Sequence, residues 1–119
     1  MAVTVINVTG TIYDPSGNAV AGGKIEIKLS SPGTTDDAGT EVVVAPDAEF
    51  VIGVNGSVDM DLVPNDLITP SGTVYHVRFI TNDGNSWREV WQIDSAGADP
   101  IDIGNVTRIS TVATVSATG

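Results

Sequence analysis

The chain has 119 residues, of which 41% are hydrophobic, and this predicts one globular domain with a buried core. Fifteen Asp and Glu against five Lys and Arg give a net charge of −10, which opposes binding to nucleic-acid phosphates and to anionic membranes. The absence of cysteine excludes disulfides and thiolate metal sites, and no apolar run reaches the roughly 18 residues of a membrane-spanning helix.

The N-terminal part of the chain predicts two strands joined by a tight turn. Residues Met1 to Thr4 lack the basic start and apolar core of a signal peptide, so we expect a complete mature chain made in the cytosol. A strand is predicted at 3–13, and the turn Asp14-Pro15-Ser16-Gly17 follows it. Proline presets φ there, aspartate bonds the backbone ahead, and glycine tolerates positive φ. The strict alternation of a second strand at 23–29 predicts one buried and one solvated face.

The rest of the chain predicts further short strands, with turn residues between nearly all of them, and no convincing helix. These strands lie at 41–45, 49–54, 57–63, 74–81, 87–94 and 105–115. Two stretches have the composition of loops: 30–39, which is polar, and 63–72, in which Leu67 and Ile68 are expected to anchor in the core. This spacing predicts an all-β fold, a single antiparallel β-sandwich of about seven or eight strands.

The clearest strand pair is a hairpin formed by residues 74–80 and 87–93, because an Asp-Gly pair lies between two alternating runs. A two-residue turn at Asp83-Gly84 would put the large rings of the two strands on opposite faces. A three-residue loop from Asp83 to Asn85 places all of them on one face. We prefer the second arrangement, because a slip of one residue moves every side chain to the other face.

The preferred register makes specific pairs across the hairpin. It places Val77 opposite Trp91 and leaves the polar side chains on the outer face. The other aromatic-face pair is Tyr75 with Ile93, and the outer-face residues are His76, Arg78, Arg88 and Gln92. The same register puts Glu89 on the aromatic face opposite Phe79, where the carboxylate needs an edge position or a partner.

The last fifteen residues, 105–119, alternate Val and Ile with Ser and Thr and contain one charged residue, Arg108. Two alternatives stay open for them: a final strand of the sandwich, or an arm that pairs with a neighbouring molecule by strand addition. We therefore divide the chain into a β-sandwich domain at 1–104 and a β-prone C-terminal arm or final strand at 105–119.

Catalytic chemistry has little support in the sequence. His76 is the only histidine and lies within a predicted strand, and no Gly-x-Ser-x-Gly segment occurs, so we expect it to be a structural or surface residue. Asp59 and Asp61 lie two apart on one strand face, which makes a charged pair rather than a catalytic dyad. We expect no enzyme activity, no catalytic residue and no cofactor.

Metal and phosphate sites are also not expected. Asp36-Asp37 and the segment from Asp94 to Asp99 resemble a calcium loop only loosely. The pair Gly22-Gly23 precedes a strand and not the start of a helix, so it does not form a phosphate-binding loop.

The aromatic residues leave one functional alternative. Trp87 and Trp91, with two tyrosines and nearby acids, could form a sugar-stacking platform on a β-sandwich. We favour the interpretation that both tryptophans, four residues apart on one strand face, are large core residues. Exposed tryptophans would favour the alternative, a carbohydrate-binding or adhesion module.

Two segments carry a resemblance to known modules: the opening hairpin, Val8 to Ile27, and the stretch from Leu62 to Val77 with the Trp87 strand after it. Together they cover about half of the chain. They resemble small β-sandwiches of the carboxypeptidase-regulatory or prealbumin-like type, which recur in bacteriophage tail and capsid-surface proteins.

The resemblance implies an Ig-like or prealbumin-like sandwich that serves as a structural protein of a bacteriophage virion. Such a protein would be a minor tail or fibre component or a capsid decoration protein, located in the virion. Its implied partners are copies of itself and other virion proteins, with a host-surface glycan as a further candidate and with neither nucleic acid nor membrane among them.

Overall fold

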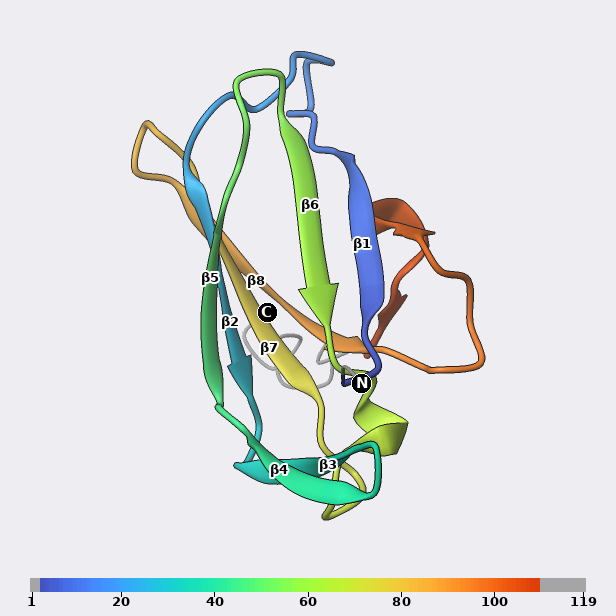
Figure 1. Ribbon diagram of the computed structural model, residues 1–119. Coiled ribbons are helices and arrows are strands. Elements are labelled where there is room, and N and C mark those ends of the chain that lie inside the picture. The colour runs from blue at the N-terminus through green and yellow to red at the C-terminus, as the bar shows by residue number, and fades with distance from the viewer. Residues whose placement is uncertain (1–2, 110–119) are drawn as a thin grey trace.

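The computed structural model describes residues 3–109 and confirms the prediction of an all-β protein (Figure 1). The described residues form ten strands: β1 (Ile6–Thr11), β2 (Lys24–Leu29), β3 (Gly33–Asp37), β4 (Thr40–Val44), β5 (Asp47–Val51), β6 (Ser57–Leu62), β7 (Tyr75–Ile80), β8 (Ser86–Gln92), β9 (Ile101–Asp102) and β10 (Thr107–Arg108). Two short 3₁₀ helices, η1 (Asn65–Leu67) and η2 (Ile103–Asn105), are the helical turns of the described range.

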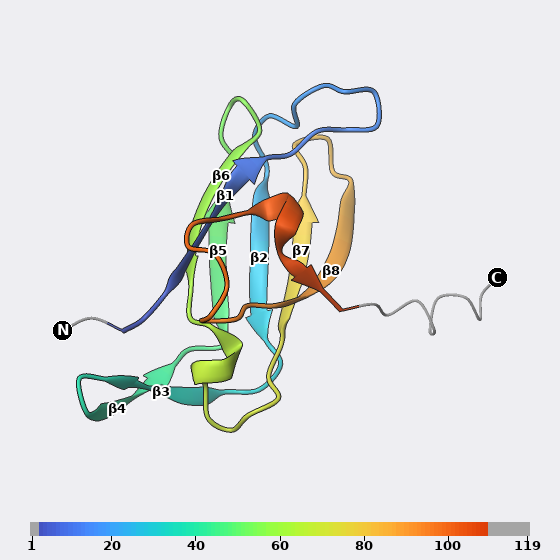
Figure 2. The same cartoon turned by 90° about the vertical axis from the view of Figure 1, so that its right-hand side faces the viewer.

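Two sheets face each other across one core, which is the layered arrangement of a β-sandwich (Figures 1 and 2). The smaller sheet has the order β6-β1-β9 and the larger the order β10-β8-β7-β2-β5. Their strands pair antiparallel except for β1 and β9, which are parallel. A third pair, β3-β4, forms a ribbon at one end of the sandwich. The loop after β1 and the β7–β8 loop lie at the opposite end.

The core follows the alternation of the sequence, because successive side chains of a strand point to opposite faces. In β2 the apolar residues are at most 2% exposed and the three charged residues face outward, as predicted. The inward residues of β6 are buried in the same way. Ile68 anchors in the core as expected, but Leu67 is 38% exposed, because the 3₁₀ turn points the amide of Asn65 inward instead.

The strand count is higher than predicted, in part because residues 30–39 are not a loop. They contain β3, which pairs with β4 across a turn at Ala38-Gly39. The two residues that β3 buries are Gly33 and Thr35, so the strand has no apolar alternation and its polar composition hid it. In addition, β5 lies at 47–51 and not at 49–54, and the two-residue strand β9 was not predicted.

The predicted hairpin forms, but its register is displaced by two residues. The pairs are Tyr75 with Trp91, Val77 with Glu89, and Phe79 with Trp87. The predicted pairs of Val77 with Trp91, Tyr75 with Ile93 and Glu89 with Phe79 are therefore wrong. A displacement of two keeps every side chain on its predicted face, so the rings still share one face.

The position of glycine in the loop explains the displacement. The amide of Thr81 donates to the carbonyl of Asn85 over 2.9 Å, so the three-residue loop is Asn82 to Gly84. In such loops the last residue adopts a positive φ, and Gly84 has a φ of +90°. A loop from Asp83 to Asn85 would place Asn85 at that position and glycine in the middle.

The C-terminal segment begins within the larger sheet. Thr107 pairs with Gln92 and Arg108 with Trp91, so these two residues continue the sheet beyond β8. The remainder of the predicted arm, residues 110–119, lies outside the described residues. Whether that part of the chain is a final strand or an arm therefore stays open.

Candidate functional site

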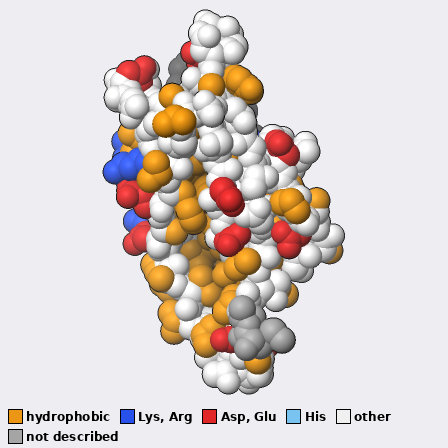
Figure 3. Space-filling view, turned by 45° about the horizontal axis from the view of Figure 1, so that its top comes forward, with side chains coloured by type: hydrophobic (Ala, Val, Ile, Leu, Met, Phe, Trp, Pro, Cys, Tyr) orange, Lys and Arg blue, Asp and Glu red, His pale blue; other side chains and the backbone are white. Residues whose placement is uncertain are grey.

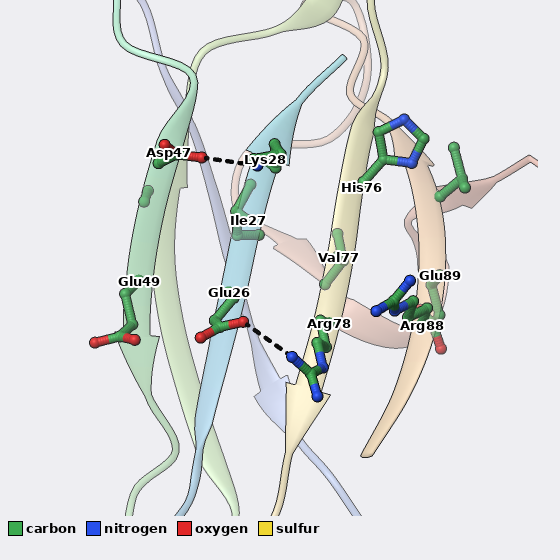
Figure 4. A pocket seen from close by; sticks show the side chains of 12 residues that line it. Glu26, Ile27, Lys28, Asp47, Glu49, His76, Val77, Arg78, Arg88 and Glu89 are labelled. Atoms are coloured by element: carbon green, nitrogen blue, oxygen red, sulfur yellow. Dashed lines mark ion pairs between the residues drawn. The ribbon is translucent and has the colours of Figure 1, made fainter.

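The outer face of the larger sheet holds four of the protein's five basic residues, Lys24, Lys28, Arg78 and Arg88. Alternation along β2, β7 and β8 directs these side chains away from the core. The face forms a shallow hollow of about 960 Å³ across β5, β2, β7 and β8 (Figure 4). Strands distant in the sequence thus bring most of the positive charge of an acidic protein onto one surface.

The charges on this face are ordered from one edge of the sheet to the other. Asp47 and Glu49 lie on β5, while β7 and β8 present Arg78 and Arg88, and β2 between them carries both signs (Figure 4). The ion pairs across adjacent strands are Lys24–Glu49 at 3.2 Å, Arg78–Glu26 at 3.8 Å and Lys28–Asp47 at 4.0 Å. These pairs are exposed, so each stabilises the fold little.

Two arginines lie directly opposite each other on β7 and β8. Arg78 pairs in register with Arg88, and like charges in such a cross-strand pair repel each other. Arg78 is balanced by Glu26, whereas Arg88 takes part in none of the ion pairs within residues 3–109. The β8 side of the face therefore offers a positive charge to an acidic partner.

The smaller sheet is acidic on its outer face. Asn7 on β1 donates through its side-chain amide to Asp59 over 2.6 Å and to Asp61 over 2.9 Å, and its backbone amide donates to Asp99. This arrangement supports the interpretation of Asp59 and Asp61 as a charged surface pair. On the side of the molecule seen in Figure 3, acidic side chains spread over the surface and the basic ones lie at its edge.

A second hollow, of about 570 Å³, lies between the loop after β1 and the β7–β8 loop. Tyr13 and Trp87 line it and are 63% and 38% exposed. The expectation that both tryptophans fill the core holds for Trp91, which is fully buried, but is wrong for Trp87. In the described chain β10 covers β8 only at its far end, so Trp87 lies at an open sheet edge.

Two glycines hold the walls of this hollow together. Gly22 and Gly23 have φ values of +74° and +87°. A Cβ at Gly22 would collide with the side chain of Asn82, and one at Gly23 with the carbonyl of Ile80. The close approach lets Asn82 donate to the carbonyl of Ala21 over 3.1 Å. The Gly22-Gly23 pair thus serves loop packing.

The one histidine of the sequence lies on the same outer face as the basic residues. His76 is exposed on the outer face of β7, beside Lys28 on one side and Val90 on the other. Among residues 3–109 no three His, Asp or Glu side chains are grouped to hold a metal ion. Within the same range no helix is long and apolar enough to cross a membrane.

The sugar-stacking alternative grouped both tyrosines with the tryptophans. Of these residues, Tyr13 and Trp87 line the hollow, whereas Tyr75 and Trp91 are buried. Comparison of the chain with protein-family models and with curated protein sequences found no match.

Proposed function

We propose that this chain is a structural module that assembles with copies of itself as a component of a bacteriophage virion, either in a tail or fibre or as a capsid decoration. Two kinds of observation support this. The sequence resembles virion-surface sandwiches over the opening hairpin and the stretch from Leu62 to Val77. The single observation that carries the assembly role is the ordered charge on the outer face of the larger sheet.

This face is complementary to itself. A two-fold axis between β2 and β7 would place β5 of one copy, with Asp47 and Glu49, against β8 of the other, with Arg88, and would bring Glu26 on β2 near Arg78 on β7. Arg88 would then gain an acidic neighbour. Exposed Val51 lies on the same face, opposite Lys24 in register, and would contribute apolar surface. Complementary charge fixes the register of such a contact and makes it sensitive to salt.

The test is the solution mass by light scattering over a concentration series, at low and at high ionic strength. We expect a dimer or larger assembly at low salt that dissociates as salt rises. The variant Arg88→Gln should weaken association. Its control is Thr40→Glu on the exposed ribbon strand β4, which changes the net charge by the same amount without touching the face.

Two results would contradict the proposal. One is a monomer at every concentration and salt. The other is equal weakening by Arg88→Gln and Thr40→Glu, which would mean that total charge, and not this face, controls association.

A further inference from the structure

We propose that the hollow between the loop after β1 and the β7–β8 loop is a binding site for neutral carbohydrate, with a sugar ring stacked on Trp87. This site adds a ligand to the assembly role and does not depend on it. The Trp87 ring is stacked on the Phe79 ring, with the ring centroids 4.6 Å apart and an angle of 7° between the ring planes.

The stack makes Trp87 a rigid platform. Phe79 is 2% exposed and belongs to the core, so it holds the indole from behind while 38% of Trp87 stays exposed. An exposed indole ring that is already fixed loses little freedom when a ligand packs on it. The apolar C–H face of a sugar ring is a suitable partner for such a ring, because aromatic rings combine apolar area with a negative face.

A second ring lies in the same hollow. Tyr13 comes from the chain just after β1, whereas Trp87 comes from β8 of the other sheet. Small apolar residues of the first loop, including Pro15 and Ala19, complete this wall. Two exposed rings at one hollow, from separate elements, provide stacking area for an extended ligand of more than one ring.

The polar lining selects the chemistry of the ligand. Asp14 accepts from the backbone amides of Ser16 and Asn18 over 2.9 and 3.0 Å, which holds one carboxylate in place. Asp83 accepts from the hydroxyl of Thr81 and from the side-chain amide of Asn85. Both acids line the hollow and are natural acceptors for sugar hydroxyl groups.

The charge of the lining excludes acidic sugars. The hydrogen bond from the Thr81 hydroxyl lowers the pKa of Asp83, so this carboxylate is ionised at neutral pH. The residues described around the hollow include no Lys or Arg that could pair with a carboxylate or sulfate on the ligand. A neutral polyhydroxyl ligand therefore fits, and a uronic or sialic acid polymer is repelled.

The experiment is a fluorescence titration of the full chain with four neutral probes: maltohexaose, cellohexaose, chitohexaose and mannohexaose. Polygalacturonate and polysialic acid serve as acidic probes. Trp91 is fully buried, so a change in emission on binding reports Trp87. We expect at least one neutral probe to shift and quench the emission, and neither acidic probe to do so.

Variants then locate the site by isothermal titration calorimetry. Tyr13→Ala and Trp87→Ala should each raise the Kd roughly tenfold, as the loss of a stacking contact implies. Trp87→Phe keeps a ring and should retain most of the affinity. Val43→Ala, at an exposed valine of the distant β4, and Arg88→Gln, on the charged face, should bind like the wild type.

The inference is wrong if no neutral probe binds, or if Tyr13→Ala and Trp87→Ala both bind as tightly as Val43→Ala. Tyr13 is 63% exposed, so its variant keeps the test decisive even where the loss of the Phe79 stack unfolds Trp87→Ala. Normal sugar binding by a dissociated Arg88→Gln variant would separate this site from the assembly face.

Discussion

Glu89 shows how an acid is accommodated on the inner face of this sandwich. Its carboxylate accepts from the indole N–H of Trp91 over 2.7 Å and from the Nε of Arg108 over 2.8 Å. Arg108 also donates to the carbonyls of Ile103 and Val106 and lies 5.9 Å from the Trp91 ring centroid. Of the two alternatives for Glu89, an edge position or a partner, the structure shows a partner, and Arg108 joins β8 to the C-terminal segment.

Removing this partner should cost stability. We expect Arg108→Met to lower the free energy of unfolding by about 1–2 kcal/mol, because it leaves a half-buried carboxylate with one hydrogen bond fewer. The control is Arg88→Met, on the same strand as Glu89 but on the exposed face, for which we expect a change within about 0.5 kcal/mol. Urea denaturation measures both. Equal losses in the two variants would show that the Glu89–Arg108 contact does not stabilise the fold.

Tyr75 makes the stability of the folded state depend on pH in the alkaline range. Burial raises the pKa of Tyr75 to about 12, and its hydroxyl donates to the carbonyl of Val63 over 2.6 Å. The unfolded chain ionises tyrosine near pH 10, so the folded state holds this proton more tightly. The stabilisation is complete below about pH 10 and is lost as the pH rises toward about 12.

The measurement is the melting temperature as a function of pH, for the wild type and Tyr75→Phe. We expect the wild type to lose stability more steeply above about pH 10, since Tyr75→Phe has no phenol to ionise at this position. Parallel profiles would contradict the assignment.

At the scale of elements, the connection between β6 and β7 is held to the end of β8 by one buried side chain. Asn65 is 2% exposed. Its amide oxygen accepts from the backbone N–H of Ile93 over 2.8 Å, and its own backbone N–H donates to the carbonyl of Ile93. Its side-chain nitrogen donates to the hydroxyl of Thr73 over 3.2 Å. These hydrogen bonds tie the connection between the two sheets to the residue that follows β8.

Asn65→Ala should therefore destabilise the protein by about 1–3 kcal/mol, because it leaves the buried N–H of Ile93 without an acceptor. Asn105→Ala is the matched control, since Asn105 also lies in a 3₁₀ helix but is exposed. Hydrogen exchange at the Ile93 amide gives a local readout and should accelerate only in Asn65→Ala. Unchanged protection there would show that the amide has another acceptor.

Particular elements show how far sequence reasoning reached. Alternation in β2 identified its buried face, because the side-chain period of a strand is local. The same reasoning missed β3, since the residues that this strand buries, Gly33 and Thr35, are not large apolar side chains. It also displaced the hairpin register, because the register depends on which loop residue takes the positive φ.

At the scale of the whole molecule, the fold sorts the charge. The chain has a net charge of −10. The outer face of the larger sheet nevertheless holds four basic side chains against three acidic ones, Glu26, Asp47 and Glu49. The remaining surface is strongly acidic, as the smaller sheet shows. In the assembly that we propose, this distribution of charge would oppose contact between copies in most orientations and favour contact through the outer face of the larger sheet.

The sequence by itself determined the all-β class, the single core and the inward faces of β2, β7 and β8. Those properties follow from alternation and turn residues, which act over a few positions. Only the tertiary structure decided that β2 lies between β5 and β7, that Trp87 lies at an open edge beside Tyr13, and that Arg88 lies opposite Arg78. These depend on long-range pairing of strands, where many partners satisfy the same local pattern and packing of the whole core selects one.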